Sequence, residues 1–233
     1  MKTLRTTIAA ALLACAALGA HAAPGPYTSS SFASDAVAVA GAVADVDSKA
    51  SPLDTPPLIS TAVAISGADF ASASGFAGGG LLVAQAEASS ASEAVSAVGT
   101  AFFEGMFSMT GVGAVAFKID LLEQNFTDAG QFSDASLFFK LTFEGTTYAD
   151  VVLTGDDGPY VLNLTLPGAG TGMFSLLLAS EANALRGDAS NFAQAEFMAA
   201  VPEPGQLSLL LAGLGLVGVV IRSRRRIGAP SAA

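Results

Sequence analysis

The chain has almost none of the side chains that carry acid-base and metal chemistry. Its 233 residues include one cysteine, one histidine and no tryptophan, and Cys15 and His21 both lie within the first 22 residues. Imidazole is the usual general base near neutral pH, and thiolate is the usual soft nucleophile. Residues 23–233 therefore cannot form a Ser-His-Asp triad, a Cys-His dyad or a zinc site with His or Cys ligands. We expect no catalytic residue, no cofactor and no metal site, and a core without disulfides.

Basic residues are also scarce in the central part of the chain. Residues 23–200 contain 19 acidic residues against four basic ones, which gives a net charge of −15. A surface this acidic repels the phosphates of nucleic acids, so we expect no nucleic-acid partner.

The first 22 residues have the three parts of a secretory signal peptide. A basic start from Met1 to Arg5 precedes an apolar stretch from Thr6 to Gly19, and Ala20-His21-Ala22 supplies a small-x-small cleavage site. Cleavage after Ala22 leaves Ala23 as the first mature residue of an exported protein. The alternative is a lipoprotein signal with Leu12-Leu13-Ala14-Cys15 as the lipidation box.

The C-terminal region has the pattern of a short membrane anchor. Residues 207–221 carry no charge, and a cluster of arginines follows at once, comprising Arg222, Arg224, Arg225 and Arg226. A helix of this length rises about 22 Å, less than the hydrocarbon core of about 30 Å, and snorkelling arginines shorten the gap. The arginine cluster predicts that the tail 227–233 is cytoplasmic and that the acidic region lies on the other side of the membrane. The alternative, a buried helix of a globular fold, leaves the arginines without a role.

Directly before this stretch the chain reads Val201-Pro202-Glu203-Pro204. Pro-Glu-Pro, a short transmembrane helix and a terminal arginine cluster, in a chain with a signal peptide, resemble the PEP-CTERM sorting signal of Gram-negative bacteria. The resemblance covers residues 201–226. It implies export by the Sec machinery, transient retention in the inner membrane, and processing near Pro202 by an exosortase. It further implies delivery to the cell surface or extracellular matrix of an exopolysaccharide producer. In that setting exopolysaccharide is a further expected partner.

The region after residue 100 alternates bulky apolar and polar residues at a period of two. Such alternation is typical of strands with one buried and one solvated face, and turn sequences such as Asp156-Asp157-Gly158-Pro159 separate the strands. We therefore predict an all-β fold, an antiparallel β-sandwich flanked by the signal peptide and the short transmembrane helix. The apolar rows are Val115, Phe117, Ile119 and Leu121; Leu137, Phe139, Leu141 and Phe143; Tyr160, Leu162, Leu164 and Leu166; and Phe174, Leu176 and Leu178.

We place the sandwich at residues 59–200. Residues 23–58 are rich in Pro, Ala and Ser and are predicted to be an extended lead, although the Ala and Val run from 35 to 47 could pair as a strand. Residues 181–190 are predicted to form a loop or a short helix, and 192–197 the last strand.

Two more specific hypotheses, a calcium site and an enzymatic site, are also open. The first is calcium at Asp156-Asp157-Gly158, where a hairpin turn explains the same residues. The second is glycoside hydrolysis, which needs only two carboxylates, with Glu104, Glu123 and Glu144 as candidates. No residue pattern pairs them across a cleft. We expect a non-enzymatic surface or matrix protein, with a carbohydrate-binding sandwich as the first alternative and a carboxylate glycosidase as the second.

Overall fold

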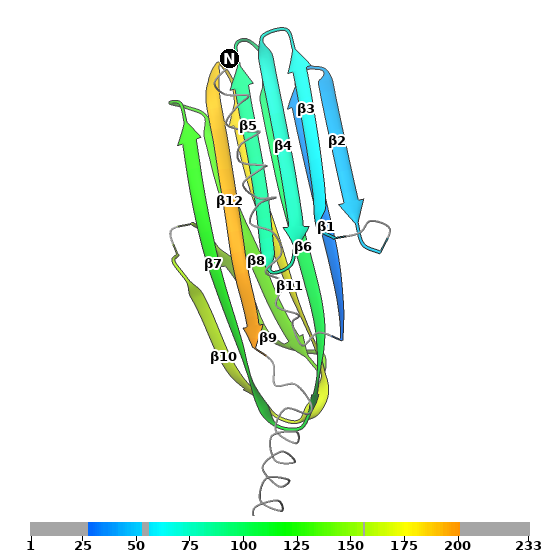
Figure 1. Cartoon of the computed structure of the whole chain (residues 1–233). Coiled ribbons are helices and arrows are strands. Elements are labelled where there is room, and N and C mark those ends of the chain that lie inside the picture. Colours follow the sequence, from blue (N-terminus) through cyan, green and yellow to red (C-terminus); the bar gives the residue numbers. More distant parts are fainter. Residues whose placement is uncertain (1–27, 53–55, 156, 201–233) are drawn as a thin grey trace, which may run out of the picture.

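Two antiparallel sheets of six strands pack face to face in an elongated sandwich (Figure 1). The computed structural model describes residues 28–52, 56–155 and 157–200. Twelve strands occupy this part of the chain: β1 (Ser29–Ala40), β2 (Val43–Ala50), β3 (Leu58–Ser66), β4 (Asp69–Gly78), β5 (Leu81–Ser90), β6 (Val95–Thr110), β7 (Gly113–Thr127), β8 (Phe132–Phe143), β9 (Thr146–Leu153), β10 (Tyr160–Leu166), β11 (Ala169–Ala184) and β12 (Gly187–Ala200).

The strand order separates the two layers cleanly. Sheet A has the order β2-β1-β6-β11-β8-β9, and sheet B has the order β10-β7-β12-β5-β4-β3. Four hairpins stay within one sheet: β1–β2, β3–β4, β4–β5 and β8–β9. The other connections cross from one sheet to the other, so the chain builds both layers together. The predicted all-β antiparallel sandwich is confirmed.

The apolar rows predicted from the sequence lie on the inner faces of four strands. In β7, Val115, Phe117 and Ile119 are buried, whereas Lys118 and Asp120 are exposed. The rows of β8 and β11 are buried in the same way, and β10 carries the row that ends at Leu166. Burial of these side chains provides the main free-energy gain for a fold without disulfides.

Two local predictions are corrected. Residues 23–58 are predicted to lie outside the sandwich, with a strand at 35–47 only as an alternative, yet β1 and β2 fall within them, and β1 pairs with β6 along its whole length. Residues 181–190 form neither a helix nor a long loop, because β11 runs to Ala184 and β12 starts at Gly187. In both places alanine recurs at alternate positions, and tertiary pairing outweighs its weak strand propensity.

The core has two parts of different composition. The lower half in Figure 1 holds the larger cluster, with eight buried or partly buried phenylalanine rings among leucines. The upper half is lined almost wholly by alanine, with Val95 as the one larger side chain of the second cluster. Because a methyl group spans little distance, the alanine half requires the two sheets to lie closer together than the phenylalanine half.

A band of small and polar residues, here called the seam, separates the two parts of the core. On it the Ser34 and Ser60 hydroxyls lie 2.8 Å apart, and the Ser180 hydroxyl donates to the Asn191 side-chain oxygen (2.9 Å). All four residues are buried, and their hydrogen bonds join sheet A to sheet B. The remaining seam residues are Gly75 and Gly99.

The two glycines of the seam let the sheets touch through their backbones. A Cβ atom on Gly99 would lie 2.3 Å from the Ser74 carbonyl oxygen and 2.5 Å from that of Gln85. A Cβ on Gly75 would lie 2.1 Å from the Thr100 carbonyl oxygen. Both clashes involve the opposite sheet's backbone, which no side-chain rotation relieves.

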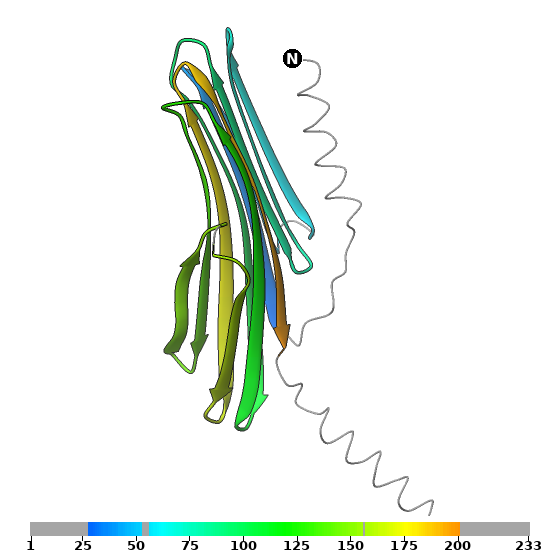
Figure 2. The ribbon, with the colours of Figure 1, turned by 90° about the vertical axis from the view of Figure 1, so that its left-hand side faces the viewer.

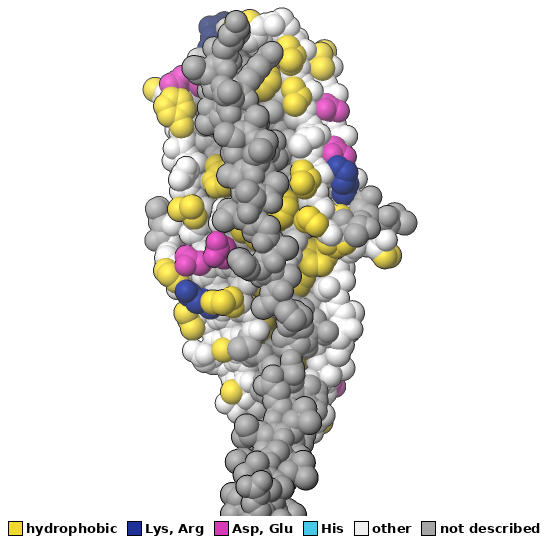
Figure 3. Space-filling model, in the orientation of Figure 1, with side chains coloured by type: hydrophobic (Ala, Val, Ile, Leu, Met, Phe, Trp, Pro, Cys, Tyr) yellow, Lys and Arg dark blue, Asp and Glu magenta, His cyan; other side chains and the backbone are white. Residues whose placement is uncertain are grey.

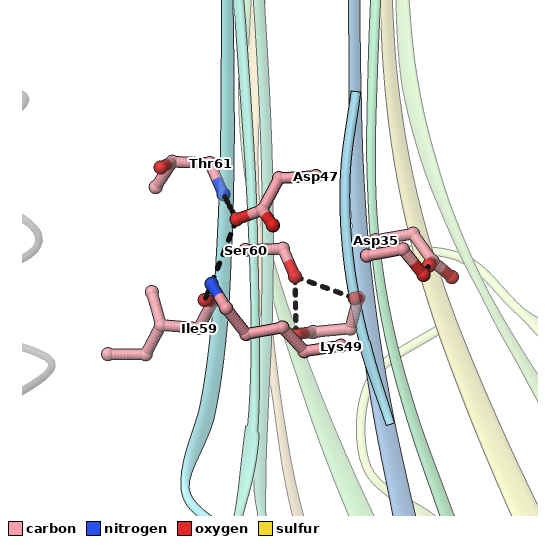
Figure 4. A network of polar contacts seen from close by, with 8 residues as sticks. Asp35, Asp47, Lys49, Ile59, Ser60 and Thr61 are labelled. Atoms are coloured by element: carbon pink, nitrogen blue, oxygen red, sulfur yellow. Dashed lines mark hydrogen bonds and ion pairs between the residues drawn. The ribbon is translucent and has the colours of Figure 1, made fainter. Parts of the chain in front are cut away.

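One lateral edge of the sandwich is closed by side chains. Asp45, Asp47 and Lys49 alternate along β2 and face the unpaired edge of β3. The Thr61 backbone N–H donates to Asp47 Oδ2 (2.9 Å), and Lys49 Nζ donates to the Ile59 carbonyl (Figure 4). The Val63 N–H donates to Asp45 Oδ2, also at 2.9 Å. We call this side of the sandwich the clamped edge.

The charges of the clamped edge also support one another. Lys49 Nζ lies 2.9 Å from Asp47 Oδ2. This hydrogen bond, followed by the one from the Thr61 amide, lowers the pKa of Asp47 below its ordinary value. The carboxylate therefore stays charged at neutral pH and keeps its acceptor role.

Asp69 holds the turn between β5 and β6. Its Oδ1 accepts from the backbone N–H groups of Ala91 (2.5 Å) and Ser92 (3.0 Å), and its Oδ2 from the Ser92 hydroxyl (3.1 Å) and the Glu93 N–H (3.3 Å). The bond from the Ala91 amide is the largest of the effects that lower the pKa of Asp69. One buried carboxylate thus satisfies the backbone of a whole turn.

We predict that Gly99→Ala lowers the free energy of unfolding of residues 23–200 by about 1 to 3 kcal/mol, because the added methyl forces the sheets apart. Urea denaturation at pH 7 measures the change. Gly168→Ala is the matched control, since a Cβ there meets nothing within 4 Å. Equal stability of the two variants would contradict the backbone contact at the seam.

We predict that Asp69→Asn destabilises the sandwich at pH 7 and that its difference from the wild type shrinks toward pH 3. The pKa of Asp69 is lower in the folded state, so its contribution is complete above the unfolded value of about 3.9 and is lost as the pH falls through the folded value. Urea denaturation at both pH values measures this. Asp120→Asn, at an exposed position of β7, is the control. A loss that does not depend on pH would show that the carboxylate charge does not hold the turn.

Candidate functional site

The sequence-predicted addressing residues fall outside the described part of the chain. These are Ala20, Ala22 and Ala23 at the predicted cleavage site, Val201, Pro202, Glu203 and Pro204, and the four arginines at 222 and 224–226. Among the residues that the structure describes, no helix is long and apolar enough to cross a bilayer. The last described strand, β12, ends at Ala200, immediately before the Pro-Glu-Pro sequence.

The three candidate glutamates lie on three different elements. Glu104 is on the outer face of β6, and Glu123 is on β7, where it accepts from the Asn191 side-chain amide (2.6 Å). Glu144 is in the turn after β8 and accepts from the Thr171 backbone N–H (2.5 Å). Two of the three carboxylates are thus engaged in holding the fold, and none of their contacts joins one candidate to another.

The structure describes only part of the turn that the calcium hypothesis concerns, because Asp156 lies outside the described residues. Asp157 Oδ2 accepts from the backbone N–H and the hydroxyl of Thr154, at 2.7 and 3.1 Å, which is the local turn chemistry of an aspartate. Gly158 has φ +69°, as a tight turn requires. Within residues 28–52, 56–155 and 157–200, no three His, Cys, Asp or Glu side chains gather in a metal-binding group.

The outer face of sheet A carries an apolar row that crosses the strands. The register places Phe102 of β6 beside Leu177 of β11, Leu177 beside Phe138 of β8, and Phe138 beside Val152 of β9. Leu177, Phe138 and Val152 are 37, 46 and 54% exposed, and Phe102 is half-buried. We call these four residues the sheet A row.

Polar residues border the sheet A row on both sides. On one side, Glu104, Ser175, Lys140 and Asp150 pair in sequence across β6, β11, β8 and β9, and Lys140 Nζ lies 3.9 Å from Asp150 Oδ2. On the other side Thr100 and Ser136 flank Ala179 in the register. An apolar strip between two strips of hydrogen-bonding groups has the chemistry to stack a sugar ring and bond its hydroxyls.

The spacing of the aromatic rings follows from the sheet itself. Phe102 and Phe138 lie on strands that both pair with β11, so their backbones are about 10 Å apart. One exposed and one half-buried ring at that distance suit an extended ligand that runs across the strands better than a compact one. The sheet A row therefore has the form of a platform and not of a pocket.

The outer face of sheet B differs. Figure 3 shows hydrophobic side chains on this face as well. Here Ile59, Phe76 and Val83 share a row, but the next residue across is Gln194 of β12. Polar residues interrupt the apolar ones, so this face lacks an unbroken strip across the sheet.

The sheet A row was not identified from the sequence, although a signal was present. Phe102-Phe103, Phe138-Phe139 and Leu176-Leu177-Leu178 each place bulky apolar residues next to one another. Because successive side chains of a strand point to opposite faces, each doublet puts one of them outside. Only the pairing register shows that the three outward members line up.

Comparison with known proteins supports the C-terminal assignment. Residues 200–226 match the family model of the PEP-CTERM protein-sorting motif. The match covers the sorting segment, so it concerns delivery and leaves the activity of the sandwich open. It implies processing by an exosortase and export to the cell envelope or surface of a Gram-negative bacterium.

No curated protein matches the chain. Among solved structures, TmCBM61 in complex with β-1,4-galactotriose is similar over 53% of this chain and 83% of its own, at 13% identity and a TM-score of 0.24. A likeness of this size carries no argument about this chain.

Proposed function

We propose that the protein is an exported, non-enzymatic protein that an exosortase sorts to the cell surface or the extracellular polysaccharide matrix, where the β-sandwich is its displayed part. The observation that carries the proposal is the junction at residue 200. The last strand ends at Ala200, and the matched sorting motif covers residues 200–226. Processing near Pro202 would therefore release the sandwich without removing any residue of its core.

The composition supports a passive role. Among the described residues, the acidic side chains of Asp69 and Asp47 accept hydrogen bonds from backbone N–H groups and so hold the fold in place. With the only histidine and cysteine confined to the first 22 residues, the sandwich has no group that is both nucleophilic and neutral-pH basic. We infer from this that the sandwich acts by display or binding and not by turnover.

We predict that mass spectrometry of the mature protein finds a C-terminus near Pro202 in cells with the exosortase and an intact C-terminus in cells without it. Replacing Pro202, Glu203 and Pro204 together by alanine should give the intact end in both strains. An identical, uncut end in both strains for the wild type would contradict sorting by an exosortase and favour a permanent anchor.

A second candidate function is carbohydrate binding through the sheet A row. The observation that favours it is the apolar strip with Phe102 and Phe138 between two polar strips. Exopolysaccharide is the ligand class that the sorting destination would bring to this face. A carboxylate glycosidase remains the third possibility and differs from the second by the release of cleaved sugar.

We predict that a glycan array retains residues 23–200 on a subset of extended polysaccharides, and that Phe138→Ala weakens this binding about tenfold, or about 1.4 kcal/mol. Phe102→Ala should act in the same direction. Phe132→Ala is the matched control, because Phe132 is 49% exposed on the same strand and face as Phe138 but pairs with Asn183, away from the row.

Equal losses in Phe132→Ala and Phe138→Ala would contradict a site at the row. The absence of any retained glycan would remove the second candidate and leave the matrix role without direct sugar contact. Shortened glycans after incubation would contradict the non-enzymatic assignment.

A further inference from the structure

The two lateral edges of the sandwich are treated differently. The edge strands are β2 and β9 in sheet A, and β3 and β10 in sheet B. At the clamped edge, side chains of β2 occupy the backbone groups of β3, as described above. The opposite side, formed by β9 and β10, is here called the open edge, and Figure 2 turns this side toward the viewer.

β10 has the chemistry of a strand that accepts a partner. Its seven residues, Tyr160 to Leu166, contain no charge and no proline. An edge strand leaves half of its backbone N–H and C=O groups pointing away from the sheet. Within the described residues, no side chain hydrogen-bonds to these groups, in contrast to the three side chains that cap β3.

The inner face of β10 is also incompletely covered. Tyr160, Leu162 and Leu164 point toward the core and pack against the larger cluster, but each remains half-buried. Tyr148 and Val151 of β9 are half-buried in the same way on the other sheet. Apolar side chains of the core are therefore available for further burial along the open edge.

The sequence of β10 is self-complementary about its centre. If a second β10 runs antiparallel with Asn163 opposite Asn163, then Leu162 faces Leu164 on the inner side, and Val161 faces Thr165 on the outer side. Asn163, Val161 and Thr165 are all exposed, so the asparagine pair would lie at the wet face. The arrangement has a two-fold axis through Asn163 and is isologous, the commonest form of homodimer contact.

We propose that two copies of this chain pair through β10, antiparallel and centred on Asn163, to join their B sheets into one continuous sheet. Seven residue pairs provide about six to eight backbone hydrogen bonds. The half-buried leucines and Tyr160 add apolar burial on the core side. An isologous contact occupies the β10 edge of both copies, and β3, at the far edge of each B sheet, is capped by side chains of β2, so the joined B sheet ends at two copies.

Charges introduced by substitution at Asn163 test the proposal directly. Full-length chains with two different epitope tags are co-expressed, extracted in mild detergent and purified through one tag. Two N163K chains, or two N163D chains, place like charges opposite each other and should co-purify about tenfold less than wild-type chains. One N163K chain with one N163D chain should restore co-purification.

Gln124 supplies the matched control. It is an exposed amide on β7, five residues beyond the last residue of β7 that pairs with β10, and therefore outside the proposed contact between the two β10 strands. Q124K and Q124D should leave co-purification unchanged. Because residue 163 is exposed, neither substitution there disturbs the core, and circular dichroism of each variant checks the fold. Equal effects at positions 124 and 163, or no rescue by the opposite charges, would overturn the proposal.

The register has its own test, which the scarcity of cysteine makes simple. In a Cys15→Ser chain, Asn163→Cys is the sole thiol, and a short bifunctional thiol cross-linker applied to intact cells should yield dimers. Opposite Cβ atoms in an antiparallel pair are about 5 Å apart, within reach of the linker. Gln124→Cys should yield none. Dimers through Val161→Cys but not through Asn163→Cys would contradict the two-fold at Asn163.

Discussion

The direct contact of the two sheets at Gly75 and Gly99 is the constraint on which the rest of the sandwich depends. With no disulfide available to the described residues, the layers are held by packing, and their separation is set where the backbones meet. On one side of this contact, alanine methyls fill a thin space, and on the other, phenylalanine rings packed mostly at tilted angles fill a thicker one. A larger residue at either glycine would change both halves together.

The polar residues inside the sandwich follow from the same geometry. Close sheets leave little room for water, so the hydroxyls and amides of the seam have to bond to one another across the layers. Ser34 bonds to Ser60, and Ser180 to Asn191, which in turn bonds to Glu123. These bonds fix the register of one sheet on the other, which apolar methyl groups alone specify poorly.

The surface features have a common origin, because the outward side chains of a sheet and the outer backbone groups of its edge strands have no partner within the sheet. On sheet A, doublets such as Phe138-Phe139 are forced to show one ring to the outside, and the register gathers these rings into a row. At the lateral edges, β3 is capped by charged side chains of β2, whereas β10 is neutral and uncapped. The first feature offers a platform to an extended ligand and the second offers a strand to another copy.

The sequence by itself determined the address and the class of fold. Pro202-Glu203-Pro204 with its arginine cluster is a local signal that needs no folded context, and the match at residues 200–226 bears it out. The buried rows of β7, β8 and β11 were predictable because bulky residues at a period of two indicate a strand with one buried face. The loss of histidine and cysteine chemistry after residue 22 is likewise a fact of composition.

Only the tertiary structure decided which strands are neighbours and which residues pair across them. β1 and β2 were not assigned to the sandwich from the sequence, because their alanine-rich segments carry little strand propensity. Pairing with β6 holds β1 as a strand, and pairing with β1 holds β2. The sheet A row, the clamped edge and the open edge all depend on register between distant segments. The sequence encodes that register through long-range packing, which no local pattern reports.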